Sequence, residues 1–187
     1  MTSSARVAFV AVLLLGSKPA LSQDLVGVFF DTNGESTSYI TSVENEIVSL
    51  YLTILAPSAS GPIEDFVGTV SFVSEGSVVN WNAAPVSGCS TAWVWPTAYL
   101  YCAEPLSPSS VVVVLEYTVE VPSPATTVEA YLRLNEVEGP FYMVAGSDEQ
   151  IRLNPVAGSF DDPAAVINAG AVSAAGSSWG TLKSIYR

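Results

Sequence analysis

The fold is decided by Val111-Val112-Val113-Val114-Leu115-Glu116-Tyr117-Thr118-Val119-Glu120-Val121 in this chain of 187 residues. Every odd-numbered position in this stretch is apolar, while Glu116, Thr118 and Glu120 are polar. β-Branched and aromatic residues with a period of two are typical of a strand that buries one face and exposes the other to water. The stretch therefore predicts one long strand with its odd-numbered residues turned toward a core.

The same alternation recurs on both sides of that strand. Val48, Leu50, Leu52 and Ile54 alternate with polar or half-polar residues, and so do Val128, Ala130, Leu132 and Leu134. Shorter strands are predicted at residues 26–30, 66–73, 78–83, 92–95, 98–102, 141–144 and 150–153. Turn sequences such as Asn33-Gly34 and Gly139-Pro140 separate them. Short turns between half-buried strands favour antiparallel pairing in two packed sheets, so we expect an all-β sandwich of roughly eight to ten strands.

The first 22 residues have the features of an export signal. A start carrying Arg6 precedes an unbroken apolar run at residues 7–15, and Ala20-Leu21-Ser22 supplies small residues for cleavage after Ser22. The apolar run is about half of the ~20 residues that a membrane-spanning helix needs. We therefore expect a cleaved signal helix, no membrane span, and a mature protein that is secreted, either extracellular or periplasmic.

The charge of the chain excludes some partners. Its 18 acidic residues outnumber its 6 basic residues, and loss of Arg6 and Lys18 with the signal would lower the net charge from −12 to −14. Such a surface repels phosphate backbones and anionic lipid, so we expect no nucleic-acid partner. The chain is nevertheless 49% hydrophobic, which is enough to fill a core.

Cys89 and Cys102 are the only cysteines. In an exported chain, an isolated pair is most simply one disulfide, which would stabilise the fold by about 3 kcal/mol for a loop of this length. Two free thiols or half of a metal site remain the alternatives. The chain has no histidine with which to complete a zinc site.

Aromatic residues gather between the two cysteines and give the best candidate for a binding site. Trp93 and Trp95 share one face of a predicted hairpin, Tyr99 and Tyr101 share one face of its returning strand, and Trp81 precedes them. A turn at Pro96-Thr97-Ala98 would set the two pairs opposite each other across the strands. These five residues could form a platform for sugar rings, or the tryptophans could lie inward and close the sandwich.

Catalytic and metal-binding chemistry finds less support. Without histidine, the nucleophile systems that rely on it are absent, and a pair of carboxylates of the kind used by glycosidases is what remains. Asp65 and Asp161-Asp162 are the acids in suggestive settings, and both are also typical of turns and caps. Asp31, Asn33 and Glu35 supply oxygens at alternate positions after a strand, which makes calcium possible there. The same composition is typical of an ordinary type I turn.

The composition changes near the C-terminus, which divides the chain into three parts. We expect a signal peptide at residues 1–22, a sandwich domain at 23–158, and a linker with a C-terminal tail at 159–187. The tail combines Trp179, Leu182 and Tyr186 with Lys183 and Arg187. A cationic, aromatic tail on an anionic body could fold back onto its own domain, or it could be offered to a partner, another copy or the export machinery.

The order of the long alternating strands, with residues 111–121 and 128–134 late in the domain, resembles the jelly-roll sandwich of cohesins and related carbohydrate-binding modules. Val26-Gly27-Val28-Phe29-Phe30-Asp31 and the ending Ser178-Trp179-Gly180-Thr181-Leu182-Lys183-Ser184-Ile185-Tyr186-Arg187 resemble the two ends of a group of uncharacterised exported bacterial proteins. The cohesin resemblance implies binding of protein or glycan rather than turnover of a substrate.

Three functions remain open on the sequence. The first is a secreted, non-catalytic binding or adhesion module that recognises glycan or an extracellular protein through an aromatic patch or a loop end. The second is a structural subunit of an extracellular layer or fibre that self-associates through the tail. The third is a carboxylate-dependent glycoside hydrolase. We favour the first, and we expect no cofactor other than calcium.

Overall fold

A computed structural model describes residues 23–76, 78–94, 97–133 and 139–169, with the backbone alone for residues 93, 94 and 97. All regular structure in these residues is strand, which confirms the all-β prediction. The strands are β1 (Leu25–Phe29), β2 (Ser38–Tyr39), β3 (Glu46–Leu55), β4 (Ile63–Ser74), β5 (Asn80–Pro85), β6 (Cys89–Val94), β7 (Thr97–Leu106), β8 (Val111–Val121), β9 (Val128–Arg133), β10 (Phe141–Val144), β11 (Gln150–Arg152), β12 (Asn154–Pro155) and β13 (Ala165–Ile167).

Two predicted segments lie outside the described residues, namely the signal at 1–22 and the tail beyond residue 169. Among the residues that the structure does describe, no helix has the length and apolar character of a membrane span.

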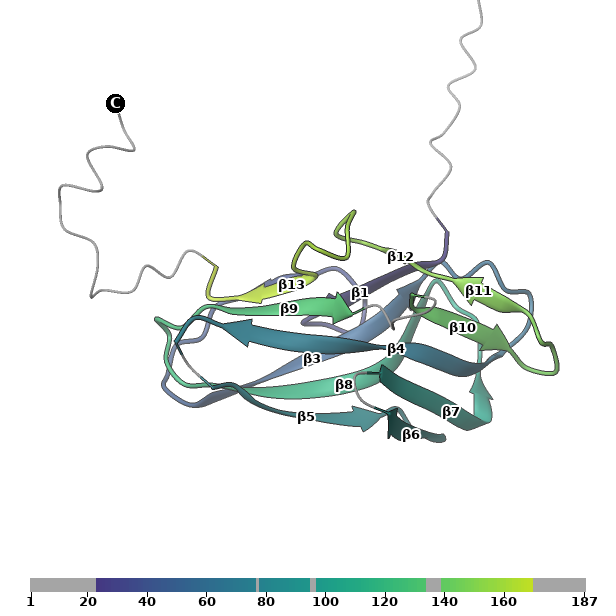
Figure 1. Ribbon diagram of the computed structural model, residues 1–187, viewed down its shortest axis with the longest axis horizontal. Helices are drawn as coiled ribbons and strands as arrows, with labels where there is room; N and C mark the ends of the chain where they lie inside the picture. The colour runs from purple at the N-terminus through teal and green to yellow at the C-terminus, as the bar shows by residue number, and fades with distance from the viewer. Residues whose placement is uncertain (1–22, 77, 95–96, 134–138, 170–187) are drawn as a thin grey trace, which may run out of the picture.

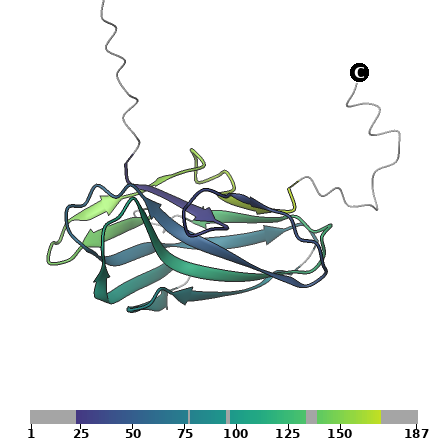
Figure 2. The ribbon, with the colours of Figure 1, turned by 180° about the vertical axis from the view of Figure 1, so that it is seen from behind.

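The strands form two sheets that pack face to face (Figure 1). One sheet has the order β12-β1-β3-β8-β5, and Figure 2 shows it from its outer side. The other has the order β11-β10-β4-β9-β13-β2, and β6 and β7 are added beside β4. The predicted sandwich is confirmed. Two short pairs, β1 with β12 and β13 with β2, are parallel rather than antiparallel. The two strands of each pair are far apart in the sequence, so no hairpin makes them antiparallel.

The pairing of β3 with β8 forms the centre of the first sheet, and β8 has the bounds predicted for it. The register shifts between Leu52 and Thr53, which leaves Val114 without a partner on β3. Such a bulge inserts one residue and reverses the alternation of side chains. Val112 and Val114 are therefore buried, at 5% and 0% exposure. The prediction that all odd-numbered residues face the core is wrong for Val111 and Val113, which stay partly exposed.

β4 changes its partners half-way along its length. Residues 63–68 pair with β10 and with β7, whereas residues 69–74 pair with β9. β9 and β10 follow one another along the same edge of β4, and β7 lies along the opposite edge (Figure 1). Within the described residues, the second half of β4 consequently has a strand partner on one edge only.

The second sheet continues past Gly158, where the sequence suggested a linker. β13 pairs with β9, and the chain after it is held by Asn168, which is 2% exposed and has a φ of 56°. The Asn168 Oδ1 accepts a hydrogen bond from the Thr41 N–H at 2.8 Å, and its Nδ2 donates to the Thr126 carbonyl at 3.0 Å. This buried network fixes the point at which the C-terminal segment leaves the sandwich.

Substitution by phenylalanine should change the free energy of unfolding differently at two buried tyrosines. The Tyr142 hydroxyl donates to Asp24 Oδ1 at 2.8 Å and accepts from the Ala59 N–H at 3.2 Å. The Tyr117 hydroxyl is buried and has no hydrogen-bond partner among the described residues. We expect Tyr142→Phe to lower the free energy of unfolding by about 1–3 kcal/mol, and Tyr117→Phe to leave it unchanged or raise it. Urea unfolding measures both values, and equal losses would contradict this account.

Candidate functional site

The outer face of the second sheet carries two rows of side chains across β6, β7, β4 and β10. The inward residues of β7 are Ala98, Leu100 and Cys102, which are at most 5% exposed, so Tyr99 and Tyr101 turn outward. Each row consists of residues that lie opposite one another on neighbouring strands. One row is Ser90, Tyr101, Asp65 and Met143, and the other is Ala92, Tyr99, Val67 and Phe141. We call this surface the Tyr101 face.

The Tyr101 face is apolar at its centre and has one strongly exposed aromatic residue. Val67 and Phe141 are buried although they lie on the outer side, at 4% and 8% exposure, whereas Tyr101 is 50% exposed. Tyr99, Asp65 and Met143 are half-buried. A tyrosine in this position offers a large apolar ring together with a hydroxyl that can form a hydrogen bond, which suits a contact surface.

Asp65 adds a negative charge to this face. Burial is the main cause that raises the pKa of its carboxyl, and the neighbouring Glu64 adds to it. Its cross-strand neighbours are Tyr101 on one side and Met143 on the other. A half-buried carboxylate in that setting would be stabilised by a cationic group that approached from outside.

Sequence reasoning singled out Tyr99 and Tyr101, and it named Asp65 separately as an acid, but it did not bring them together on one face. The missed members, Val67, Phe141 and Met143, lie on strands that sequence reasoning did find. Alternation along residues 66–73 places Val67 on the face opposite Phe66, and this pattern could have identified Val67 as an outward residue. The hairpin of β6 with β7 was predicted, whereas the pairing of β7 with β4 was not readable from the chain.

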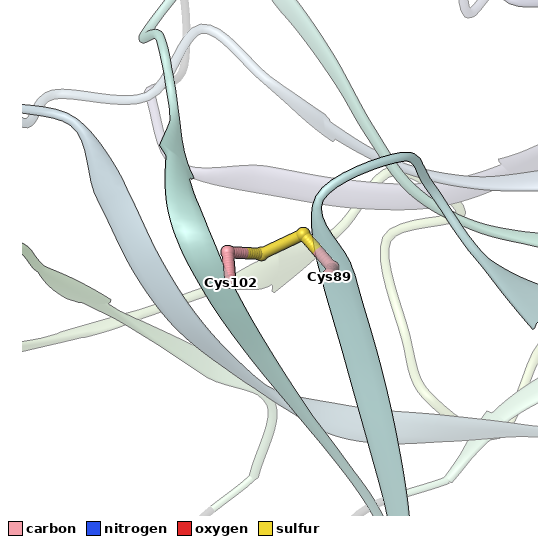
Figure 3. The surroundings of a disulfide bond; sticks show 2 residues. All are labelled: Cys89 and Cys102. Atoms are coloured by element: carbon pink, nitrogen blue, oxygen red, sulfur yellow. A yellow bond between two sulfur atoms is a disulfide. The ribbon is translucent and has the colours of Figure 1, made fainter.

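The disulfide closes the hairpin that presents this face. Cys89 of β6 and Cys102 of β7 are bonded to each other, as predicted (Figure 3). They are directly opposite residues of the two strands, thirteen positions apart in the chain. The bond therefore holds β6 and β7 in one register at the end of the hairpin away from its turn.

That register contradicts the predicted cross-strand aromatic pairs. Trp93 pairs with Ala98, while Tyr99 pairs with Ala92. Because residues 95 and 96 alone separate the paired Val94 and Thr97, every odd-numbered residue of β6 faces an even-numbered residue of β7. The turn expected at Pro96-Thr97-Ala98 is wrong, because Thr97 and Ala98 are already paired residues of β7. The side chain of Trp93 and the whole of Trp95 lie outside the described residues.

Trp81 lies on the other sheet, away from the Tyr101 face. It lies on β5 and pairs with Val119 of β8, which turns its ring inward between the sheets. The centroid of the ring lies 5.9 Å from that of Phe72 and 6.0 Å from that of Tyr117. Trp81 is 39% exposed, because β5 is an edge strand. It closes one side of the core rather than extending the surface around Tyr101.

The loop after β1 is held by the Asp31 carboxylate. Asp31 Oδ1 accepts hydrogen bonds from the N–H groups of Asn33 at 2.8 Å and Glu35 at 3.3 Å, and its Oδ2 accepts from Ser36 N–H at 2.6 Å. Burial alone would raise the pKa of Asp31, but these N–H groups, together with that of Gly34, lower it below 3.8. Both oxygens are thus engaged within the turn, and calcium at Asp31, Asn33 and Glu35 stays a prediction without support from this geometry.

The remaining acidic candidates do not form a metal centre in the described residues. Asp161 and Asp162 are exposed in the turn before β13, where the Asp161 N–H donates to Ser159 Oγ at 3.1 Å. No group of three or more cysteine, aspartate or glutamate side chains within the described ranges could hold a metal ion. These two aspartates are explained as turn residues.

Comparison with known proteins supports the fold. No protein-family model and no curated protein matches the chain. The sixth cohesin of scaffoldin B from Acetivibrio cellulolyticus, solved in complex with a mutant dockerin, superposes with a TM-score of 0.52 at 7% identity over 79% of this chain and 99% of that chain. This confirms the cohesin-like sandwich that the strand order suggested.

A second structure is more distant. The C-terminal domain of the antigen I/II-family protein AspA from Streptococcus pyogenes gives a TM-score of 0.31 at 12% identity, over 71% of this chain and 45% of that chain. The resemblance of the two chain ends to uncharacterised exported proteins stays a prediction.

The Asp31 turn gives a pH-dependent prediction. Since the folded-state pKa of Asp31 is lowered, its contribution to stability is present above about pH 4, the ordinary range of an aspartate, and is lost as the pH falls through the folded value. We expect Asp31→Ala to lower the melting temperature at pH 7 and to have a shrinking effect below pH 4.

Thermal unfolding across this pH range, with and without millimolar calcium, measures both effects. We expect calcium to leave the melting temperature of the wild-type chain unchanged. A rise that Asp31→Ala abolishes would instead assign a calcium site to the loop.

Proposed function

We propose that this chain is an exported, non-catalytic module that binds an extracellular protein through the Tyr101 face. The observation that carries the proposal is the exposed Tyr101 beside the half-buried Asp65, on a sheet face whose central residues are apolar. Interface cores are enriched in tyrosine and methionine, and this face contains both. The disulfide favours an oxidising compartment outside the cytoplasm, in keeping with the predicted signal.

The fold gives independent support for a protein partner. The structurally similar cohesin was solved in complex with a dockerin, which is a protein. A sheet face of this kind can match the surface of another folded protein, whereas the glycan platform suggested by the sequence needed tryptophans that shared one surface. Trp81 does not share the surface of Tyr99 and Tyr101, so a glycan is the weaker proposal.

Electrostatics narrows the class of partner. The chain carries a net charge of −12, and Asp65 is buried enough for a cation to stabilise it. We propose a partner whose contact surface includes lysine or arginine, because opposite charges speed the encounter and a matched contact to Asp65 adds specificity.

Site-specific photo-crosslinking tests this proposal. The mature chain carrying p-benzoylphenylalanine in place of Tyr101 would be exposed to the secreted and cell-surface fraction of the organism of origin. We expect one discrete adduct that disappears when unlabelled mature chain competes, and that Asp65→Lys in the labelled chain weakens at least about tenfold, since reversing a close charge pair costs more than 1.4 kcal/mol.

The matched control places the same label at Ile47, which is 71% exposed on the outer face of the opposite sheet. Equal adducts from both positions would count against the Tyr101 face. An adduct that survives protease treatment of the fraction but not periodate would identify a glycan, and an adduct with a second copy of the chain would favour the structural-subunit alternative. Either result would overturn the proposal.

A further inference from the structure

The second half of β4 has an unpaired edge within the described residues. β7 pairs with β4 only as far as Gly68, opposite Ala98, while β9 occupies the other edge from Thr69 to Ser74. An open strand edge presents N–H and C=O groups that can add another strand. We call residues 70–74 on the side away from β9 the open edge.

Hydrogen bonds elsewhere in the sheet show which peptide groups point to this edge. The Ala164 N–H donates to the Ala130 carbonyl, so Ala130 directs its peptide groups to β13, and the odd-numbered residues of β9 direct theirs to β4. Those residues lie opposite Ser71 and Val73. The peptide groups of Phe72 and Ser74 therefore point away from β9 and into the open edge.

The side chains at this edge are incompletely covered. Phe72 is half-buried although its ring contacts Trp81 and Tyr117, and Val73 is 44% exposed. The Ser74 hydroxyl is buried without a hydrogen-bond partner in the described residues. Both the backbone and the side chains are thus arranged for one more extended segment.

We propose that this segment lies within the C-terminal end of the same chain, residues 178–187, and that a stretch of it as long as the open edge is added to β4 as an antiparallel strand. Reach permits it. Ile167 pairs with Val128, and Val128 pairs with Ser74, so β13 ends two strand spacings from the end of β4, and an added strand would lie three spacings away, about 14 Å. Residues 170–177 can span up to about 26 Å when extended. Passing around that end of the sheet makes the segment run from Ser74 toward Val70, opposite to β4.

Charge and composition favour the same occupant. Lys183 and Arg187 lie in this segment, among only 6 basic residues in the chain. Glu75 follows the open edge directly, and Glu129 lies opposite Val73 on β9. Ile185 and Tyr186 are residue types enriched in strands. An added strand would place apolar side chains beside Phe72 and Trp81.

Amide hydrogen exchange of the full mature chain, followed by NMR, tests the pairing. Leu182→Pro combined with Ile185→Pro removes two N–H groups from the segment and leaves the sandwich untouched. We expect the Phe72 and Ser74 amides to exchange at least about tenfold faster in this variant than in the wild type, while those of Ser71 and Val73, bonded to β9, stay unchanged. Ala174→Pro is the matched control outside the segment and should change none of the four.

Equal exchange of Phe72 and Ser74 in the wild type and the double-proline variant would overturn the proposal. Sedimentation of the same samples shows whether the added strand comes from the same chain or from a second copy. A wild-type dimer that becomes monomeric in the variant would mean that the segment comes from a second copy, which would overturn the intramolecular pairing. The open edge is separate from the Tyr101 face, so Tyr101→Ala should leave the exchange of Phe72 unchanged.

Discussion

The change of partners along β4 is the constraint on which the rest of this molecule depends. Over residues 63–68, β4 is paired on both edges, which builds a continuous sheet from β10 to β6 and a broad outer face. Over residues 69–74 its only strand partner in the described part of the chain is β9. One strand therefore supports both the Tyr101 face, which we propose binds a partner, and the open edge, to which we propose a further strand is added.

The covalent link and the short turn of the β6–β7 hairpin decide which side chains reach the outer face. The bond between Cys89 and Cys102 and the direct pairing of Val94 with Thr97 set the same register from its two ends. In this register Tyr99 and Tyr101 face outward, and Leu100 faces the core. The protein thus presents a tyrosine on rigid, doubly paired strands rather than on a loop, which lowers the entropy that a binding partner would have to remove.

Sequence reasoning reached the architecture because the long strands carry strong periodicity. It found β8 with its observed bounds, and it found the inward residues of β3, since an uninterrupted period of two leaves little choice. It missed the bulge at Val114, because four consecutive valines fit either face equally well. It also missed β2, β12 and β13, which have only two or three residues and exist through their neighbours. The site was found in part: Tyr101 and Asp65 were named separately, but the arrangement that brings β7, β4 and β10 together depends on pairing between distant segments.

The register of β7 against β4 is the most direct point of test, because a slip of one residue would turn Tyr101 into the core. The Ala103 N–H donates to the Gly88 carbonyl, so the odd-numbered residues of β7 direct their peptide groups to β6 and form close, non-hydrogen-bonded pairs with β4. NMR of the mature chain should show strong α-proton nuclear Overhauser effects between Val67 and Tyr99 and between Asp65 and Tyr101. Contacts of Val67 with Leu100 in place of Tyr99 would contradict the account.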